Sequence, residues 1–270
     1  MTLWLALAAL LPGLAGPAFA QDEDLAVLIY QGTERIYTLH LPPDRRGPVP
    51  IVVALHGLDQ RVADLRRYWT MDGVADREGF AVLYPQAVSG RWAYADTRPV
   101  SGPDGRLVDD IGFIAALLDK LQADGVADPA HIFVVGESNG GLMAWTLACQ
   151  MSGRLTGVAS VITGMIERQA ELCHPKRLTP LLVIAGTEDW TQAYDGAMGQ
   201  GYRLMPFRKP WSSGAACVAA PASTWTRCPG TSQRTGPVQY GSRGPSARTR
   251  RPSNLYALRV AATFCRPSPH

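Results

Sequence analysis

The chain has 270 residues, 46% of them hydrophobic, so it is long and apolar enough to bury the core of a globular domain. Its net charge of +3 conceals an uneven distribution, because residues 196–270 hold 11 of the 26 Lys and Arg and none of the 23 Asp and Glu. This basic block is aperiodic and rich in Gly, Pro, Ser and Thr, which argues against a nucleic-acid partner.

The first 20 residues have the pattern of a secretory signal peptide. Leu3 to Leu11 form an apolar run too short to cross a bilayer, and Ala18-Phe19-Ala20 matches a cleavage site before Gln21. The usual basic start is missing, so a buried N-terminal helix is the alternative. We expect an exported protein, extracellular or periplasmic, with no membrane span and with disulfides permitted.

Strands and helices then alternate along the chain. Strands are expected at 25–30, 35–41, 51–55, 79–84, 131–135, 155–163 and 180–185, and helices at 63–78, 109–121 and 141–149. This alternation predicts an α/β domain over 21–205, with a mostly parallel sheet covered by helices on both faces. Residues 206–270 are expected to form a poorly ordered basic tail, in which only 254–262 resembles a strand or short helix.

Cys149 ends the last of these helices, and Cys173 lies in the connection that follows. They are a candidate disulfide pair, although the spacing of five cysteines does not fix their connectivity. No C-x-x-C or His-rich spacing is present, so neither a metal nor another cofactor is expected.

The segment Gly136-Glu137-Ser138-Asn139-Gly140 lies between an expected strand and an expected helix. Strand, G-x-S-x-G and helix is the pattern of a nucleophile elbow, which presents a serine hydroxyl at the start of a helix. The alternative is a chance match in a chain with 27 glycines. We predict that Ser138 is a catalytic nucleophile.

The segment Leu55-His56-Gly57-Leu58 closes an earlier strand. In enzymes with a nucleophile elbow, one backbone N–H from this loop and one from the residue after the nucleophile form an oxyanion hole, which binds the negatively charged oxygen of the reaction intermediate. These donors would be the amides of Leu58 and Asn139. His56 is an alternative general base, but it precedes the serine, whereas the order expected is Ser, acid, His.

Asp189 is the expected acid, because it follows the 180–185 strand at the edge where parallel sheets place their sites. Glu188 and Asp195 are weaker alternatives in the same loop. No suitable histidine follows, since His174 precedes Asp189 and the only later one is the terminal His270.

Several segments carry a family resemblance. They are Val52-Val-Ala-Leu-His-Gly57, Gly79-Phe…Tyr84-Pro85-Gln86, Val108-Asp-Asp-Ile-Gly-Phe-Ile114, Gly136-Glu-Ser-Asn-Gly-Gly-Leu-Met143 and Gly186-Thr-Glu-Asp189…Tyr194-Asp-Gly196. In this order they resemble the secreted polyhydroxybutyrate depolymerase and feruloyl esterase family of α/β-hydrolases, over roughly residues 35–205. The resemblance implies a cofactor-independent carboxylic-ester hydrolase with an acyl-serine intermediate. It matches Ser138 to the nucleophile and Asp189 to the acid.

The tail departs from that family, which continues with a Glu-Thr-Val-x-Phe-Trp-like helix and a Gly-Gly-Gly-His motif that carries the base. Codons permitted for 207–214 read Pro-Glu-Thr-Val-Glu-Phe-Trp when started at the third base of Phe207. The same offset from Arg259-Val-Ala-Ala-Thr reads Gly-Gly-Gly-His. A tail translated out of frame explains both matches, and an authentic divergent tail is the alternative.

The sequence therefore predicts a secreted esterase that is impaired by the lack of a catalytic histidine, acting on a small or polymeric ester. The alternatives are another serine esterase or peptidase on the same fold, and a pseudo-hydrolase that binds esters or carbohydrate without turnover. The kind of ester and the oligomeric state stay open.

Overall fold

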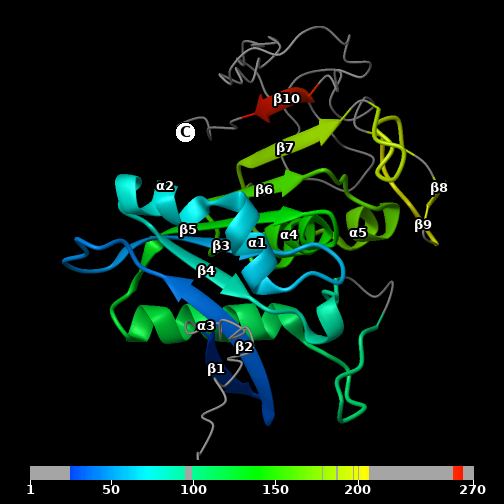
Figure 1. Ribbon diagram of the computed structural model, residues 1–270. Coiled ribbons are helices and arrows are strands. Elements are labelled where there is room, and N and C mark those ends of the chain that lie inside the picture. The colour runs from blue at the N-terminus through cyan, green and yellow to red at the C-terminus, as the bar shows by residue number, and fades with distance from the viewer. Residues whose placement is uncertain are drawn as a thin grey trace, which may run out of the picture.

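A computed structural model describes residues 25–94, 99–177, 179–186, 188–196, 198–199, 201–206 and 258–263 (Figure 1). The expected signal peptide and most of the expected tail lie outside these residues. Eight strands form one sheet in the order β1-β2-β4-β3-β5-β6-β7-β10. They are β1 (Leu25–Tyr30), β2 (Thr33–His40), β3 (Val49–Leu55), β4 (Ala81–Pro85), β5 (Ala127–Glu137), β6 (Gly157–Val161), β7 (Leu181–Gly186) and β10 (Leu258–Thr263).

The centre of the sheet is parallel and its margins are antiparallel. Strands β4, β3, β5, β6 and β7 run in one direction, while β1 and β2 pair antiparallel at one side. At the other side β10 pairs antiparallel with β7, with Leu258 opposite Gly186 and Thr263 opposite Leu181. The carboxyl ends of five parallel strands thus share one edge of the sheet, which is the edge where α/β proteins place their sites.

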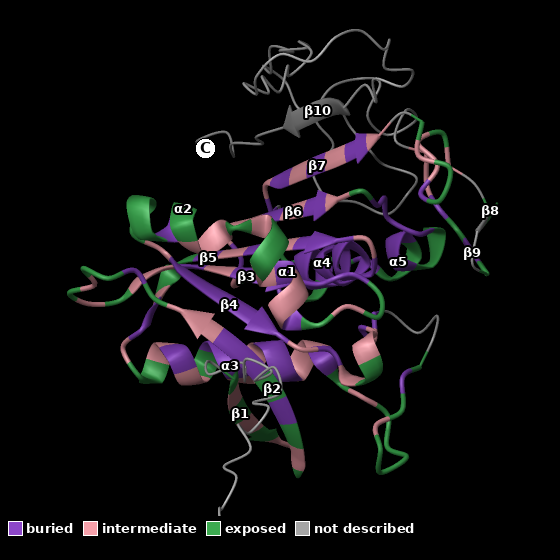
Figure 2. Cartoon of the chain, viewed as in Figure 1, coloured by how far each residue is buried: buried purple, intermediate pink, exposed green. Residues whose placement is uncertain are grey.

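Helices cover both faces, as predicted. Helices α3 (Asp110–Ala123) and α4 (Asn139–Gln150) contribute to the larger apolar core, together with β-strand residues such as Ile51 and Val53. Helices α1 (Val62–Trp69) and α2 (Met71–Glu78) pack on the alternate strand residues, including Ala54 and Val82. Helix α4 is buried from Asn139 to Cys149, while buried and intermediate residues alternate along β6 (Figure 2). The α/β class predicted from the sequence is confirmed.

One expected helix is two. The helix predicted over 63–78 breaks at Thr70, whose φ of 50° and ψ of 29° are left-handed, so α1 ends there and α2 begins at Met71. No Pro or Gly marks the break. Strand β5 also begins earlier than expected, at Ala127, because Val49 pairs with that residue across a register shift before Ile51 pairs with Ile132.

Short elements fill the connections. They are the 3-10 turn η1 (Val88–Gly90), helix α5 (Glu167–Leu172) and the two-residue strands β8 (Met198–Gly199) and β9 (Tyr202–Arg203). Strand β10 ends at Thr263 and overlaps 254–262, the single stretch of the tail for which the sequence indicates a regular element. Within the described ranges, none of the helices combines the length and apolarity needed to span a bilayer.

Candidate active site

Ser138 lies at a sharp turn between β5 and α4. Its φ of 49° and ψ of −116° are a strained backbone conformation for a non-glycine residue, of the kind that costs about 1–3 kcal/mol. The Ser138 N–H donates to the carbonyl oxygen of Val161 at 3.0 Å, and the Leu142 N–H donates to the carbonyl oxygen of Ser138, also at 3.0 Å. The surrounding strand and helix therefore hold the strained turn in place.

The two glycines of the motif are required by close contacts. A Cβ added to Gly136 would lie 2.1 Å from the carbonyl oxygen of Gly140. A Cβ added to Gly140 would lie 2.3 Å from the carbonyl oxygen of Leu55 and 2.5 Å from that of His56. The turn at Ser138 consequently rests directly on the end of β3, with backbone against backbone.

A second strained residue lies beside this turn. Ile162, directly after β6, has a φ of 55°, which is an outlier for a β-branched residue. Its N–H donates to the carbonyl oxygen of Ile184 at 2.7 Å, so β7 holds the conformation. The preceding residue, Val161, supplies the carbonyl that accepts the Ser138 N–H, and the Ile162 side chain remains 39% exposed.

His56 is fully buried at the end of β3, and both of its ring nitrogens are bonded. Nε2 accepts the Ala87 N–H at 3.0 Å, so the ring proton is on Nδ1, which donates to the Gly57 carbonyl oxygen at 2.7 Å. Burial lowers the pKa of His56 and outweighs the raising effects of the Gly57 bond and the Glu137 charge. A neutral ring with no available nitrogen does not suit His56 to the alternative role of general base.

Two backbone amides, on the segments that follow β3 and Ser138, have no acceptor in the described part of the chain. Among the described residues, neither the Leu58 N–H nor the Asn139 N–H donates a hydrogen bond to the chain. Leu58 follows the His56-Gly57 segment on which Gly140 rests, and Asn139 opens α4. Unpaired amides on two adjoining backbone segments can bind a negatively charged oxygen, as the sequence predicts for these two residues.

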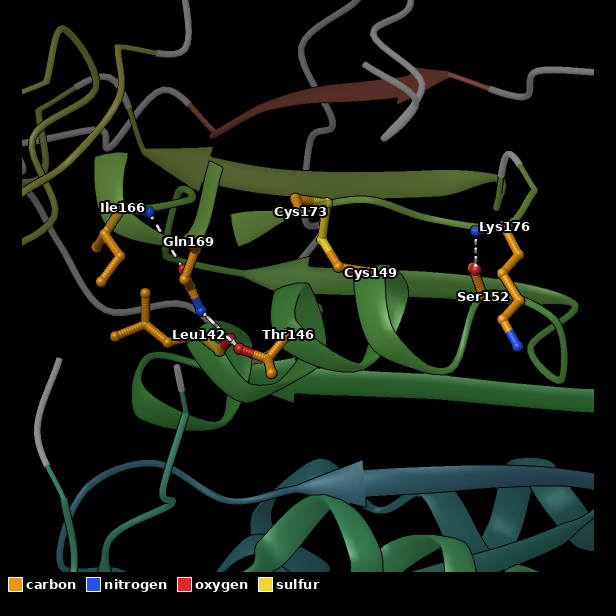
Figure 3. Close-up of a disulfide and its surroundings, with 8 residues drawn as sticks. All are labelled: Leu142, Thr146, Cys149, Ser152, Ile166, Gln169, Cys173 and Lys176. Carbon is orange, nitrogen blue, oxygen red and sulfur yellow. Dashed lines mark hydrogen bonds between the residues drawn. A yellow bond between two sulfur atoms is a disulfide. The ribbon is translucent and has the colours of Figure 1, made fainter. Parts of the chain in front are cut away.

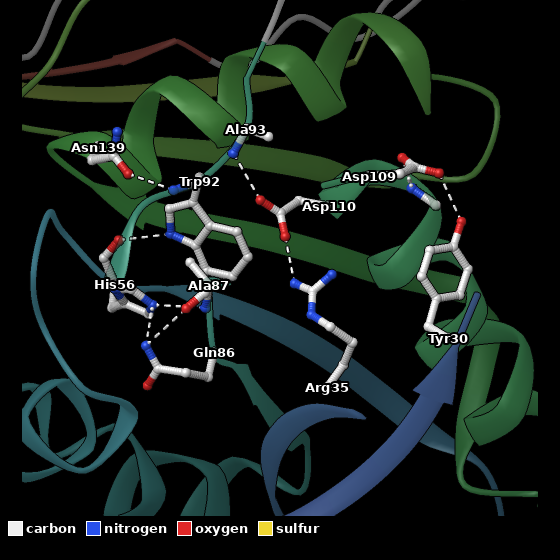
Figure 4. Close-up of polar contacts among 11 residues, drawn as sticks. Tyr30, Arg35, His56, Gln86, Ala87, Trp92, Ala93, Asp109, Asp110 and Asn139 are labelled. Carbon is white, nitrogen blue, oxygen red and sulfur yellow. Dashed lines mark hydrogen bonds and ion pairs between the residues drawn. The ribbon is translucent and has the colours of Figure 1, made fainter. Parts of the chain in front are cut away.

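The segment 86–93 connects these two backbone segments (Figure 4). The Trp92 N–H donates to Asn139 Oδ1, and the Trp92 indole Nε1 donates to the carbonyl oxygen of His56, both at 2.9 Å. The Ala93 N–H donates to Asp110 Oδ2 at 2.7 Å. Asp110 is fully buried and ion-paired with Arg35. Burial raises the pKa of Asp110, and the Arg35 charge opposes this rise.

Asp189 lies in the loop after β7, with one carboxylate oxygen bonded and the other open. Oδ1 accepts the Thr191 N–H at 2.8 Å, the Thr191 hydroxyl at 2.7 Å and the Gln192 N–H at 2.9 Å. Partial burial acts to raise the pKa of Asp189, but these three bonds together hold it below its usual value. Oδ2 has no bonding partner among the described residues. Glu188 and Asp195, the alternatives, are exposed.

Gln192 ties the Asp189 loop to the turn after β6. Its side chain is buried, and its Oε1 accepts the Thr163 hydroxyl at 2.6 Å. Sequence reasoning missed both Gln192 and Trp92, because each acts through a contact with a residue distant in the chain. The one available signal was that Trp92 interrupts a polar, glycine-containing loop with a large apolar side chain.

The described histidines other than His56 do not reach the edge that carries Ser138. His40 lies opposite Val82, near the amino end of β4, where its Nε2 is 2.7 Å from Asp76 Oδ1. His131 lies in the amino-terminal half of β5, 2.6 Å from Asp128 Oδ2, and His174 follows Cys173, which is bonded to Cys149 at the end of α4 opposite Ser138. His270, the one histidine that follows Asp189 in the sequence, lies outside the described residues.

Helix α4, which follows Ser138, is cross-linked near its carboxyl end. A disulfide joins Cys149 to Cys173, the candidate pair (Figure 3). Nearer the serine, Gln169 Nε2 donates to the Leu142 carbonyl at 2.6 Å and to the Thr146 hydroxyl at 2.9 Å. Within the described part of the chain, no group of three or more His, Cys, Asp or Glu could hold a metal ion.

The chain is similar to a described protein family and to several esterases and depolymerases. The model of the family described as Esterase PHB depolymerase matches residues 35–170. "Putative esterase NocK" of Nocardia uniformis subsp. tsuyamanensis is 31% identical over 176 residues, which are 63% of this chain and 49% of that protein. Poly(3-hydroxyalkanoate) depolymerase C of Paucimonas lemoignei is 27% identical over 46% of this chain and 30% of its own length.

Feruloyl esterase B of Neurospora crassa is 32% identical over 117 residues, 42% of this chain and 38% of that protein. Among solved structures, a thermostable esterase superposes with a TM-score of 0.48 at 20% identity, over 63% of this chain and 48% of its own. The chain thus spans about half the length, or less, of these relatives.

Proposed function

The chain belongs to the Esterase PHB depolymerase family, because that family's model matches residues 35–170, half of its length, and from this premise we propose that it cleaves carboxylic esters through Ser138. By descent it is a serine-type ester hydrolase with an α/β-hydrolase fold. The observation that carries the proposal is the strained turn at Ser138, and the Leu58 and Asn139 amides, which donate to no described residue, support it.

The proposed reaction begins when Ser138 Oγ attacks the ester carbonyl carbon. The carbonyl oxygen becomes negatively charged and receives hydrogen bonds from the Leu58 and Asn139 amides, each donor being worth roughly 3–4 kcal/mol in the transition state. The ester C–O bond then breaks, the alcohol leaves, and water later hydrolyses the acyl-serine. The hydroxyl proton needs an acceptor, and Asp189 Oδ2 lies open to orient an imidazole that would serve.

Turnover by the chain as given is proposed to be slow. No described histidine is available to take the Ser138 proton, so the reaction depends on the oxyanion hole and on solvent. This same observation favours a second candidate, a pseudo-hydrolase that binds esters or carbohydrate without turnover. Another serine esterase or peptidase on this fold is a further alternative within the enzyme class.

The proposed substrates are hydroxyalkanoate, feruloyl or acetyl esters, by analogy with relatives named for the first two. We place the protein outside the cytoplasm, in line with the signal-peptide pattern of residues 1–20 and with the Cys149–Cys173 disulfide.

The test compares the full chain with Ser138→Ala. Release of p-nitrophenolate from p-nitrophenyl acetate should be slow but measurable with excess protein, and a fluorophosphonate probe should label Ser138 weakly. Both signals should fall to background in Ser138→Ala. A release rate that this substitution leaves unchanged would rule out Ser138 as the nucleophile, and zero release by the parent chain would favour the pseudo-hydrolase.

A further inference from the structure

We infer that Trp92 is a positioning residue that sets the spacing between the two amides of the oxyanion hole. The inference rests on the proposed function, since it concerns how the Leu58 and Asn139 amides meet one oxygen atom. It goes further in assigning a role to a residue outside the loops that supply the donors. The role follows from three sets of contacts.

The first set joins Trp92 and its neighbours to the Leu58 loop. The indole Nε1 donates to the His56 carbonyl at 2.9 Å, and the His56 ring contacts the indole with centroids 5.0 Å apart. Two residues earlier, the Gly90 carbonyl accepts the Asp59 N–H at 2.9 Å. Leu58 thus lies between two residues, His56 and Asp59, that are both bonded to the segment containing Trp92.

The second set joins Trp92 to the turn at Ser138. Its backbone N–H donates to Asn139 Oδ1 at 2.9 Å, and the Asn139 side chain is itself buried. Asn139 also supplies the other amide. A single residue, Trp92, therefore bonds the backbone carbonyl on one side of the proposed hole and the side chain of the donor residue on the other (Figure 4).

The third set fixes the position of Trp92 itself. The next residue, Ala93, donates its N–H to Asp110 Oδ2, and Asp110 is ion-paired with Arg35 of β2. The Arg35 guanidinium lies 3.9 Å above the Phe113 ring of α3. Trp92 is fully buried, so both of its hydrogen bonds form away from water. The connection is rigid because its far end is built into the core.

A small change in the distance between two donors is costly in such a site. Removing one donor outright costs roughly 10²–10³ in rate, and a displacement of about 1 Å can cost about 10². Loss of the indole bond leaves both donors in place but no longer fixes their separation. We therefore expect a rate loss of roughly tenfold, smaller than for removal of a donor.

The experiment compares p-nitrophenyl acetate with its thionoester, whose C=S group is a poor hydrogen-bond acceptor and gains little from an oxyanion hole. Trp92→Phe removes the indole N–H and keeps an aromatic ring, and Asn139→Ala removes the acceptor of the Trp92 N–H. Each should lower the rate of ester cleavage about tenfold and the rate of thionoester cleavage less than twofold. Rates are measured in the full chain with excess protein, after subtraction of the Ser138→Ala rate.

Tyr30→Phe is the matched control. It also removes one hydrogen bond from an aromatic residue, the 2.7 Å bond to Asp109 Oδ2 at the N-cap of α3, but it leaves the bonds of Trp92 and the Ala93–Asp110 bond in place. Its ester-to-thionoester ratio should equal that of the parent chain. Hydrogen exchange over 56–60 provides a second measurement, since the Asp59 amide should lose protection in Trp92→Phe and retain it in Tyr30→Phe.

The outcomes distinguish the positioning role of Trp92 from the proposed function. Equal losses on both esters, or no loss on either, would overturn the positioning role while Ser138→Ala still abolishes activity. A parent rate that survives Ser138→Ala would instead overturn the proposed function, and the catalytic meaning of Trp92 would fall with it. Unchanged exchange at Asp59 in Trp92→Phe would overturn the physical connection independently of any rate.

Discussion

The two carboxylate oxygens of Asp189 differ in their hydrogen bonding. Three donors from Thr191 and Gln192 fix Oδ1, while Oδ2 has no partner among the described residues. An acid that orients a catalytic imidazole needs this combination, because one oxygen must be held while the other accepts the ring N–H. These contacts fit the role of triad acid that we propose for Asp189, although no described histidine contacts its Oδ2.

We predict that imidazole added to the solution partly replaces the missing base. General-base catalysis contributes typically 10²–10⁴-fold, so a mobile imidazole should raise the Ser138-dependent rate on p-nitrophenyl acetate about tenfold. The gain is the excess over the sum of imidazole alone and protein alone. It should vanish in Ser138→Ala and shrink in Asp189→Asn, which still folds the loop but no longer stabilises an imidazolium. An equal gain in all three proteins would contradict the prediction.

His56 predicts a pH dependence of stability. Burial depresses its pKa in the folded protein, whereas the unfolded chain binds a proton near pH 6.5. Between pH 6.5 and the lower folded pKa only the unfolded state binds this proton. The free energy of unfolding is therefore highest above pH 6.5 and falls as the pH is lowered toward the folded pKa, by at most about 1.4 kcal/mol per pH unit. Urea unfolding at pH 7.5, 6.5 and 5.5 should show this loss in the parent chain. In His56→Gln the free energy of unfolding should fall less steeply as the pH is lowered. An equal pH dependence in the two proteins would contradict the lowered pKa of His56.

At the scale of elements, the sequence predicts most strands because each is a short apolar or alternating run. The break at Thr70 was not predictable from local pattern, since no Pro or Gly marks it and the apolar residues continue through it. The early start of β5 arises from a pairing with Val49 that lies far away in sequence. Helix α5 has only six residues, too few for a helical period to be recognised.

The residues of the candidate site also fall into those that the sequence could predict and those that it could not. Ser138, Leu58, Asn139 and Asp189 could be proposed because a local motif or a strand end marks each. The residues that bind those loops to one another, Trp92, Gln192 and Asp110, could not, because their partners are fixed only by the fold. Asp110 lies in the first turn of α3, where Asp109 caps the helix through the Gly112 N–H at 2.8 Å, but its bond to the Ala93 N–H depends on the fold.

The disulfide is expected to stabilise the region around α4. Cys149 and Cys173 close a loop with a sequence separation of 24, for which chain entropy predicts about 3 kcal/mol of stabilisation. The double variant Cys149→Ser, Cys173→Ser should lower the free energy of unfolding by about that amount, measured by urea unfolding. The parent chain unfolded under a reductant should match the double variant. Identical midpoints for oxidised parent and variant would contradict the prediction.

At the scale of the whole molecule, five parallel strands deliver Ser138 and Asp189 to one edge of the sheet. Strand β10 does not continue that pattern, because it runs antiparallel to β7 and its Thr263 end lies beside Leu181, at the opposite edge. The segment that in the resembled family brings a histidine to the site is thus the one whose sequence departs from it. The direction of β10 and the departure of the tail sequence from the resembled family both concern the same segment, and for this reason we keep the out-of-frame hypothesis for the tail.

A chain whose reading frame is shifted at codon 206 should be the better enzyme. Restoring a histidine completes the triad, and loss of one triad member typically costs on the order of 10³ or more in turnover. Three proteins should be compared on p-nitrophenyl acetate: the chain as given, its His270→Ala variant and the shifted version. The first two should be equally slow and the third much faster. Substantial activity that disappears with His270→Ala would show that the terminal histidine already serves as the base.

Ile162 carries a consequence for engineering. A β-branched residue held at a φ of 55° stores conformational energy, so Asn, which tolerates this conformation, would relieve it by about 1 kcal/mol. A search for thermostable variants should therefore select this position early. Yet the carbonyl oxygen of Val161, its neighbour, accepts the Ser138 N–H, and relaxing the turn would loosen the backbone that holds the proposed nucleophile. The position is one where gains in heat resistance and losses in reactivity should appear in the same variant.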